Sequence, residues 1–154
     1  MLRINRETDY ATAILSLMAQ EPDECYSAAW LSARRCLPAP VVSKILKQLV
    51  RAQLLVSHRG AKGGYSLARP AEEISIAAVI NAIEGPIALT DCIEGGNSAC
   101  QYSAHCAVSS NWSRINDVFQ HALEAVSLKD MSEPLAAEHP GLRALGERVR
   151  SAVN

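Results

Sequence analysis

Residues 40–67, PVVSKILKQLVRAQLLVSHRGAKGGYSL, decide the fold of this 154-residue chain. Pro40 suits the first turn of a helix, because a backbone N–H at that position has no partner inside the helix. Apolar residues recur at helical spacing as far as about Ala52, on a face that comprises Val42, Ile45, Leu46 and Leu49. The opposite face is polar and basic, and it comprises Ser43, Lys44, Lys47, Gln48 and Arg51. The pattern predicts an amphipathic helix with a basic outer surface.

Two short β-capable runs follow this helix, on either side of a tip that is rich in glycine and basic residues. Gly60, Gly63 and Gly64 stand within five positions of one another, and they allow the backbone to approach a ligand closely. No lysine–serine pair of a phosphate-binding loop follows them, so nucleotide binding is not indicated. The two runs predict a β-hairpin, and a hairpin directly after such a helix is typical of a wing.

The segments before this helix complete a helix-turn-helix. Residues 7–19 have the apolar spacing of an amphipathic helix. Ser27 is a favourable N-cap for a second helix over residues 28–35, and Pro38 disfavours helix at the residue before it. Two helices, a short turn and a hairpin predict a mainly α fold with one small β-hairpin, the winged helix-turn-helix.

The rest of the chain predicts an apolar helix over residues 74–83, a polar segment and one long helix. Apolar residues recur on the long helix at spacings of 4, 3, 4, 4 and 3, at Val108, Trp112, Ile115, Phe119, Leu123 and Val126. We expect this stripe to pack on a second copy of the chain, and the alternative is that it folds back on its own domain. The expected organisation is a winged helix at 1–84, a cysteine segment at 85–107, a dimerisation helix at 108–127 and a short helical tail at 128–154.

Three of the five cysteines, Cys92, Cys100 and Cys106, stand in the polar segment with seven and five residues between them. Thiolates are preferred ligands of iron–sulfur clusters and of structural zinc, so the residues alone suit either group. A metal-free thiol–disulfide switch is a further alternative. A chance grouping is disfavoured, because free cysteines usually lie in protein cores rather than in polar segments.

Charge divides the chain into two parts. Residues 1–70 hold ten Lys and Arg against five Asp and Glu, whereas residues 71–154 hold five against eleven. A basic half that contains a helix-turn-helix favours contact with DNA phosphates, and a solvated basic face without DNA is the plain alternative. Cys25 and Cys36 fall in this half, where we expect them to pack rather than to bind metal.

The sequence argues against an enzyme and against a membrane protein. Its histidines, His58, His105, His121 and His139, form no metalloprotease-like or triad-like pattern. It contains no apolar run long enough to span a bilayer and no secretory signal at its start, so we expect a cytoplasmic protein.

Taken together, these residues resemble the IscR/NsrR-type family of bacterial winged-helix regulators, which carry iron–sulfur clusters. The resemblance covers TDYA at 8–11, the helix-turn-helix at 27–52, the wing SHRGAKGGYSL at 57–67, the three-cysteine segment and SLKDM at 127–131. Within the family the chain is most similar to regulators of the SUF operon, which assembles iron–sulfur clusters. That likeness implies that the cluster-bound dimer represses assembly genes and that loss of the cluster relieves repression.

The resemblance implies that all three cysteines of the segment bind the cluster, and it favours a 2Fe-2S over a 4Fe-4S cluster. A non-thiolate ligand at the remaining position raises the reduction potential and suits a sensor. Related regulators take that ligand from a histidine three residues after the last cysteine or from an acidic residue near the N-terminus. Ser109 stands at the first position, so Asp9 is the leading candidate, with Glu7 and His105 also open.

The helix-turn-helix pattern places the basic helix in the major groove of double-stranded DNA, at a pseudo-palindromic operator. Because phosphate contacts outnumber base contacts, we expect Lys47 and Arg51 to position the protein and Ser43 or Lys44 to read sequence. The resemblance implies that the wing arginine enters the minor groove. The expected DNA-binding residues are Ser43, Lys44, Lys47, Arg51, Arg59 and Lys62. The alternative functions are a zinc- or thiol-stabilised module that binds protein, and a cluster-free thiol-based regulator.

Overall fold

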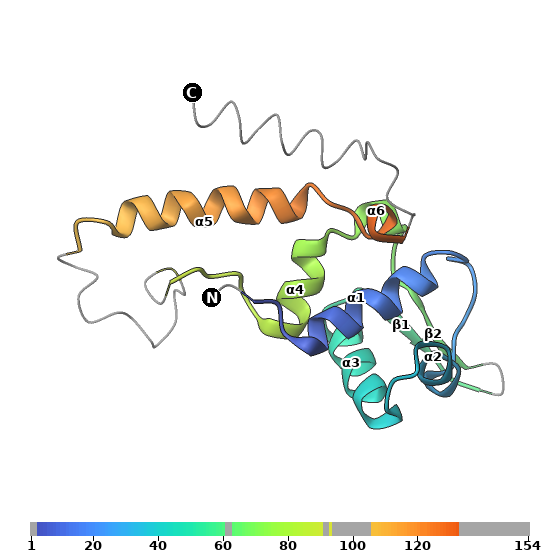
Figure 1. Ribbon diagram of the computed structural model, residues 1–154. Helices are drawn as coiled ribbons and strands as arrows, with labels where there is room; N and C mark the ends of the chain where they lie inside the picture. Colours follow the sequence, from blue (N-terminus) through green and yellow to red (C-terminus); the bar gives the residue numbers. More distant parts are fainter. Residues whose placement is uncertain (1–2, 61–62, 91–92, 94–105, 133–154) are drawn as a thin grey trace.

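The computed structural model describes residues 3–60, 63–90, 93 and 106–132, and it has the predicted mainly helical fold with one small hairpin (Figure 1). The first three helices are α1 (Arg6–Met18), α2 (Ala28–Arg35) and α3 (Ala39–Arg51), and α2 and α3 form the helix-turn-helix. Each of these helices begins within one residue of the position that the sequence predicts.

Local residues set the ends of these helices. Asn5 caps α1 by accepting hydrogen bonds from two N–H groups of its first turn, and Ser27 caps α2 by accepting one from the N–H of Trp30. Pro40 occupies the first turn of α3. Helix α2 ends at Cys36, whose φ of 53° lies in the left-handed region that ordinarily favours glycine. This residue therefore makes the sharp turn between α2 and α3.

The wing is an antiparallel hairpin of β1 (Leu55–His58) and β2 (Gly64–Leu67), in which Leu55 pairs with Leu67 and His58 with Gly64. Tyr26, just before α2, pairs with Tyr65 of β2 through backbone hydrogen bonds of 2.9 and 2.8 Å. Gly64 permits this close contact, because a Cβ atom there would lie 2.6 Å from the carbonyl oxygen of Tyr26. The wing is thereby joined to the helix-turn-helix along its second strand.

Four further elements follow in the described part of the chain: η1 (Ala71–Glu73), α4 (Ile76–Glu84), α5 (Ser109–Glu124) and α6 (Leu128–Ser132). Helix α5 runs across the top of the molecule, and α6 brings the chain back to the winged helix (Figure 1). A capping box begins α6, since Ser127 N–H donates to the Asp130 carboxylate and Asp130 N–H donates to Ser127 Oγ. Leu128, which we expected in a C-terminal tail, is fully buried in the core of the winged helix.

The core lies where α1, α3 and α4 meet. The inner face of α3 is fully buried, as its apolar spacing predicts, and it comprises Val42, Ile45, Leu46 and Leu49. Ile14 and Leu15 of α1 and Val79 of α4 pack in the same cluster. Burial of this face fixes the orientation of α3 and leaves its basic face toward solvent.

Candidate nucleic-acid interface and cysteine segment

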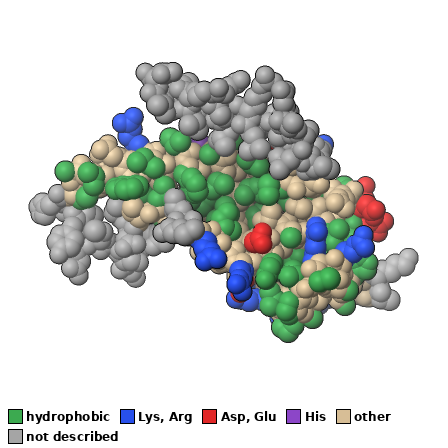
Figure 2. Space-filling view, in the orientation of Figure 1, with side chains coloured by type: hydrophobic (Ala, Val, Ile, Leu, Met, Phe, Trp, Pro, Cys, Tyr) green, Lys and Arg blue, Asp and Glu red, His purple; other side chains and the backbone are tan. Residues whose placement is uncertain are grey.

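The outer face of α3 presents three cations. Lys44, Lys47 and Arg51 are exposed, and Ser43 beside them is half-buried. Figure 2 shows Lys and Arg side chains over the winged-helix part of the molecule and hydrophobic side chains along α5. The face of α3 that the sequence predicts to bind DNA is therefore exposed to solvent.

One of these cations is already paired within the chain. The ammonium group of Lys44 lies 2.6 and 2.9 Å from the two carboxylate oxygens of Glu7, in the first turn of α1. Among the described residues, Lys47 and Arg51 have no carboxylate within ion-pair distance. The sequence gives no sign of this difference, because Glu7 and Lys44 are 37 positions apart.

The wing places Arg59 directly after β1, where the side chain is exposed. His58 Nε2 lies 2.8 Å from Ser66 Oγ across the hairpin, which ties the two strands together next to this arginine. Gly60 follows with a φ of 110°, a conformation that residues with side chains rarely adopt. Lys62, the other predicted wing cation, lies outside the described residues.

Helix α2 adds two arginines that our reading of the motifs did not single out. Arg34 and Arg35 occupy the last turn of α2, next to the turn that leads into α3. Arg34 is exposed. Nε of Arg35 and Oε1 of Gln48 on α3 are both buried, and neither atom has a hydrogen-bond partner within the described chain. The only available signal in the sequence was the adjacent pair of basic residues itself.

An aromatic pair lies beside the wing. The rings of Tyr26 and Trp30 are 4.9 Å apart, and the Tyr26 hydroxyl donates to the carbonyl of Glu21. Burial raises the pKa of Tyr26 above its ordinary value of 10.0, and the nearby carboxylates of Glu21 and Glu24 raise it further. Tyr26 is therefore neutral at physiological pH.

The cysteine segment is described at residues 85–90, at residue 93 and from Cys106 onward. Cys106 is half-buried, and its carbonyl oxygen accepts hydrogen bonds from the N–H and the hydroxyl of Ser109 at the start of α5. Cys92 and Cys100 lie outside the described residues, and within the described ranges no three His, Cys, Asp or Glu residues form a metal-binding group. Cys25 and Cys36 are exposed, so the expectation that they pack in the interior is wrong.

The start of the cysteine segment is tied to two helices. Asn81 of α4 accepts a hydrogen bond of 3.1 Å from the N–H of Ile87. Asn116 of α5 accepts one of 3.0 Å from the N–H of Leu89 and donates one of 3.2 Å to the carbonyl of Ile87. Asn116 is only 3% exposed, so its amide serves this backbone rather than solvent. A change in the segment is thus placed to act on α5.

The acidic residues weighed as a fourth cluster ligand differ in availability. Asp9 is exposed on α1, whereas both oxygens of Glu7 are engaged by Lys44. His105 lies outside the described residues. Asp9 therefore remains the accessible carboxylate near the start of α1.

The predicted apolar stripe on α5 is uncovered over much of its length. Its exposed members are Val108 at 50%, Trp112 at 40%, Ile115 at 49% and Phe119 at 38%, and Val118 at 52% lies beside them. Contiguous apolar surface of this kind marks an interaction site in a soluble protein.

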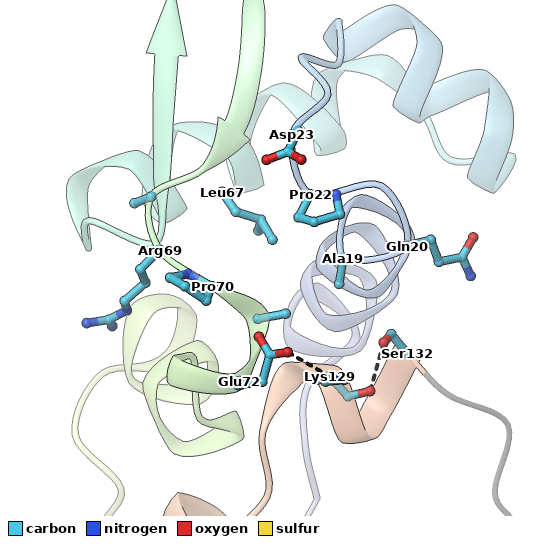
Figure 3. A pocket seen from close by; sticks show the side chains of 12 residues that line it. Ala19, Gln20, Pro22, Asp23, Leu67, Arg69, Pro70, Glu72, Lys129 and Ser132 are labelled. Carbon is cyan, nitrogen blue, oxygen red and sulfur yellow. Dashed lines mark hydrogen bonds and ion pairs between the residues drawn. The ribbon is translucent and has the colours of Figure 1, made fainter.

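A hollow of about 690 Å³ lies between the end of α1, the base of the wing and α6 (Figure 3). Lys129 and Glu72 form an ion pair of 2.8 Å at its edge, and this hydrogen bond lowers the pKa of Glu72. The hydroxyl of Ser132, which also lines the hollow, donates a hydrogen bond of 2.7 Å to the carbonyl of Lys129.

Comparison with known proteins agrees with this architecture. The family model Rrf2, described as an iron-dependent transcriptional regulator, matches residues 4–134. The chain belongs to the Rrf2 family. An IscR regulator from Photorhabdus laumondii is 28% identical over 131 residues, which are 84% of this chain and 79% of the relative. An NsrR regulator from Oceanobacillus iheyensis is 27% identical, over 84% of this chain and 89% of the relative.

Solved structures share the fold of this Rrf2 protein. CymR, the global cysteine regulator of B. subtilis, has a TM-score of 0.65 and 26% identity, over 86% of this chain and 97% of CymR. The oxidized form of Staphylococcus aureus CymR has a TM-score of 0.62 and 29% identity, over 88% and 99%. These proteins are regulators rather than enzymes, and this Rrf2 protein is accordingly a transcriptional regulator. In the described part of the chain, no helix has the length and hydropathy to cross a membrane.

Proposed function

We propose that this Rrf2 protein is a homodimeric repressor that senses iron–sulfur or redox status through a cluster held by its cysteine segment. Its targets are genes of iron–sulfur cluster assembly, such as a SUF operon. The observation that carries this proposal is the position of the three cysteines, in the one segment that joins the winged helix to α5. The description of the matching family as iron-dependent supports it.

The donor set suits an iron–sulfur cluster. Thiolates of Cys92, Cys100 and Cys106 provide three soft ligands, and the half-buried Cys106 is accessible to a metal. Asp9 is proposed as the fourth ligand because it is exposed, whereas Glu7 is paired. A 2Fe-2S cluster with one oxygen ligand supplies a redox-active, exchangeable group that suits sensing.

The winged helix is proposed to bind double-stranded DNA at a pseudo-palindromic operator. Helix α3 enters the major groove and the wing the minor groove, with Lys47 and Arg51 on phosphates and Arg59 in the minor groove. The exposure of these side chains and the cationic balance of residues 1–70 support this arrangement. Ser43, Lys44 and Lys62 complete the proposed surface.

The apolar stripe of α5 is proposed to pair with the same stripe of a second copy. A two-fold dimer presents two recognition helices to the two halves of an operator. The state of the cluster changes the conformation of the cysteine segment. The hydrogen bonds of Asn116 transmit this change to α5 and so alter the distance between the two recognition helices of the dimer. The result is a population shift between dimers of high and low DNA affinity, with the cluster-bound form repressing.

A cluster-free thiol-based regulator is the second candidate, and the likeness to CymR favours it. One of the similar structures is named as an oxidized form, and this chain exposes Cys25 and Cys36 in its helix-turn-helix half. In that case the cysteines change oxidation state without metal. A zinc-stabilised module that binds protein is the remaining alternative.

Anaerobic purification, a visible spectrum and assays for iron, sulfide and zinc separate these functions. The proposal expects a coloured protein with iron and acid-labile sulfide, both lost in Cys106→Ser and retained in the matched control Cys36→Ser. Zinc in a colourless protein supports the structural module, and no metal after reconstitution supports the thiol-based regulator. Loss of DNA binding in Arg59→Ala and Lys47→Ala, with the dimer intact, excludes the protein-binding module.

A further inference from the structure

The C-terminal end of α4 holds a carboxylate in an unfavourable place. Glu84 is the last residue of α4, where the helix dipole disfavours negative charge. Its Oε1 atom accepts a hydrogen bond of 3.1 Å from the N–H of Asn5 and one of 2.5 Å from the hydroxyl of Thr8. Thr8 is 1% exposed, so its hydroxyl depends on this acceptor. Glu84 therefore fixes the first turn of α1 against the point where the cysteine segment begins.

The same turn of α1 carries Glu7, whose carboxylate pairs with Lys44 of α3. Glu7 is one residue from Thr8 and two from Asn5, so its position depends on the turn that Glu84 fixes. Contacts of the first turn of α1 thus connect Glu84, just before the cysteine segment, with Lys44 of the recognition helix α3.

The ion pair competes with DNA for one ammonium group. A DNA phosphate that approaches the outer face of α3 needs the Lys44 ammonium that Glu7 already holds with both oxygens, and the carboxylate also repels the phosphate. Lys47 and Arg51, on the same face, have no such carboxylate within the described part of the chain. Lys44 therefore contributes less to DNA affinity than its charge suggests.

We propose that Glu7 is an internal competitor of DNA phosphates for Lys44, and that Glu84 sets the strength of this competition by fixing the first turn of α1. This inference rests on the DNA-binding role proposed for α3. Helix α1 is then a regulatory element. A displacement of the chain after Gly85 moves Glu84 and the first turn of α1, which weakens the Glu7–Lys44 pair and raises the affinity of α3 for DNA phosphate.

The test is fluorescence anisotropy of a labelled random-sequence duplex with the full-length protein, between about 50 and 200 mM salt. Glu7→Gln is expected to tighten binding about two- to fivefold, the range of one exposed ion pair. Lys44→Met is expected to abolish the tightening that Glu7→Gln produces. It should lower the salt slope by about 0.9 in the Glu7→Gln background and by less than this when Glu7 is present. The matched control is Glu72→Gln, which removes one negative charge from the exposed pair with Lys129 on η1 and α6.

The second half of the inference is tested by Glu84→Ala and, as an independent change at the same bond, by Thr8→Val. Both are expected to tighten binding when Glu7 is present and to have no further effect in the Glu7→Gln background. If Glu7→Gln binds the duplex no more tightly than Glu72→Gln does, Glu7 does not compete with DNA phosphates for Lys44. If Glu84→Ala and Thr8→Val change DNA affinity by the same factor with Glu7 present and in the Glu7→Gln background, Glu84 does not act through the Glu7–Lys44 pair. A wild-type protein that does not bind DNA at low salt overturns the proposed function as well, which distinguishes the two failures.

Discussion

Replacement of Asn116 by leucine tests whether α5 holds the start of the cysteine segment. The two side chains have the same number of heavy atoms and the same branching at Cγ, but leucine removes both hydrogen bonds, of 3.0 Å to Leu89 and 3.2 Å to Ile87. One backbone N–H and one carbonyl of a half-buried segment then lose their partner. At about 1 kcal/mol per bond, the loss is about 2 kcal/mol.

Two measurements report this loss. For a chain of this size, the melting temperature is expected to fall by about 4–8 °C. The Leu89 amide is expected to exchange with deuterium roughly 30-fold faster, because about 1.4 kcal/mol corresponds to a factor of ten. Asn111→Leu is the matched control, because Asn111 is exposed on the same helix. If Asn116→Leu matches this control in both stability and Leu89 exchange, Asn116 does not anchor the segment.

Three shorter predictions address the wing, the aromatic pair and α5. Gly64→Ala is expected to lower the free energy of unfolding in urea by about 2–4 kcal/mol, because its Cβ would lie 2.6 Å from the Tyr26 carbonyl oxygen. Gly60→Ala is expected to lower it by about 1–2 kcal/mol, because the positive φ strains the backbone but the added Cβ meets no neighbour. A larger loss in Gly60→Ala than in Gly64→Ala refutes the contact. Absorbance titration should place the pKa of Tyr26 above 10.0, and an unshifted phenol contradicts this. The raised pKa stabilises the folded protein fully below pH 10.0, and this stabilisation is lost as the pH rises beyond it. If α5 forms the proposed dimer interface, Ile115→Glu should convert the protein to a monomer in light scattering and Ser113→Glu should not. A monomeric wild type removes the basis of the proposed interface.

The elements that the sequence predicts well are those with local causes. Helix α3 is evident from its apolar spacing, and the start of α2 from Ser27, because capping and periodicity act within a few residues. The hairpin was found for the same reason, since its glycines and β-capable runs are adjacent in the chain.

Contacts between distant residues were not predictable in this way. The pairing of Tyr26 with Tyr65 and that of Glu7 with Lys44 join positions with no shared periodicity or motif. Asn116 is a polar residue on a helix that is otherwise largely exposed, and nothing in its neighbours indicates that it is the buried one. These are tertiary contacts, and they form only after local elements have been placed together.

The exposed cysteine at the end of α2 has a practical consequence for counting thiols. Cys36 adopts a φ of 53°, which glycine adopts without strain, so Cys36→Gly removes a reactive background thiol while relieving the backbone. Serine would remove the sulfur but keep the strain. Combined with a small residue at Cys25, whose sulfur lies close to Gly64, this change leaves three titratable thiols, all in the segment between α4 and α5. Alkylation stoichiometry and mass labelling of such a variant then report on that segment alone.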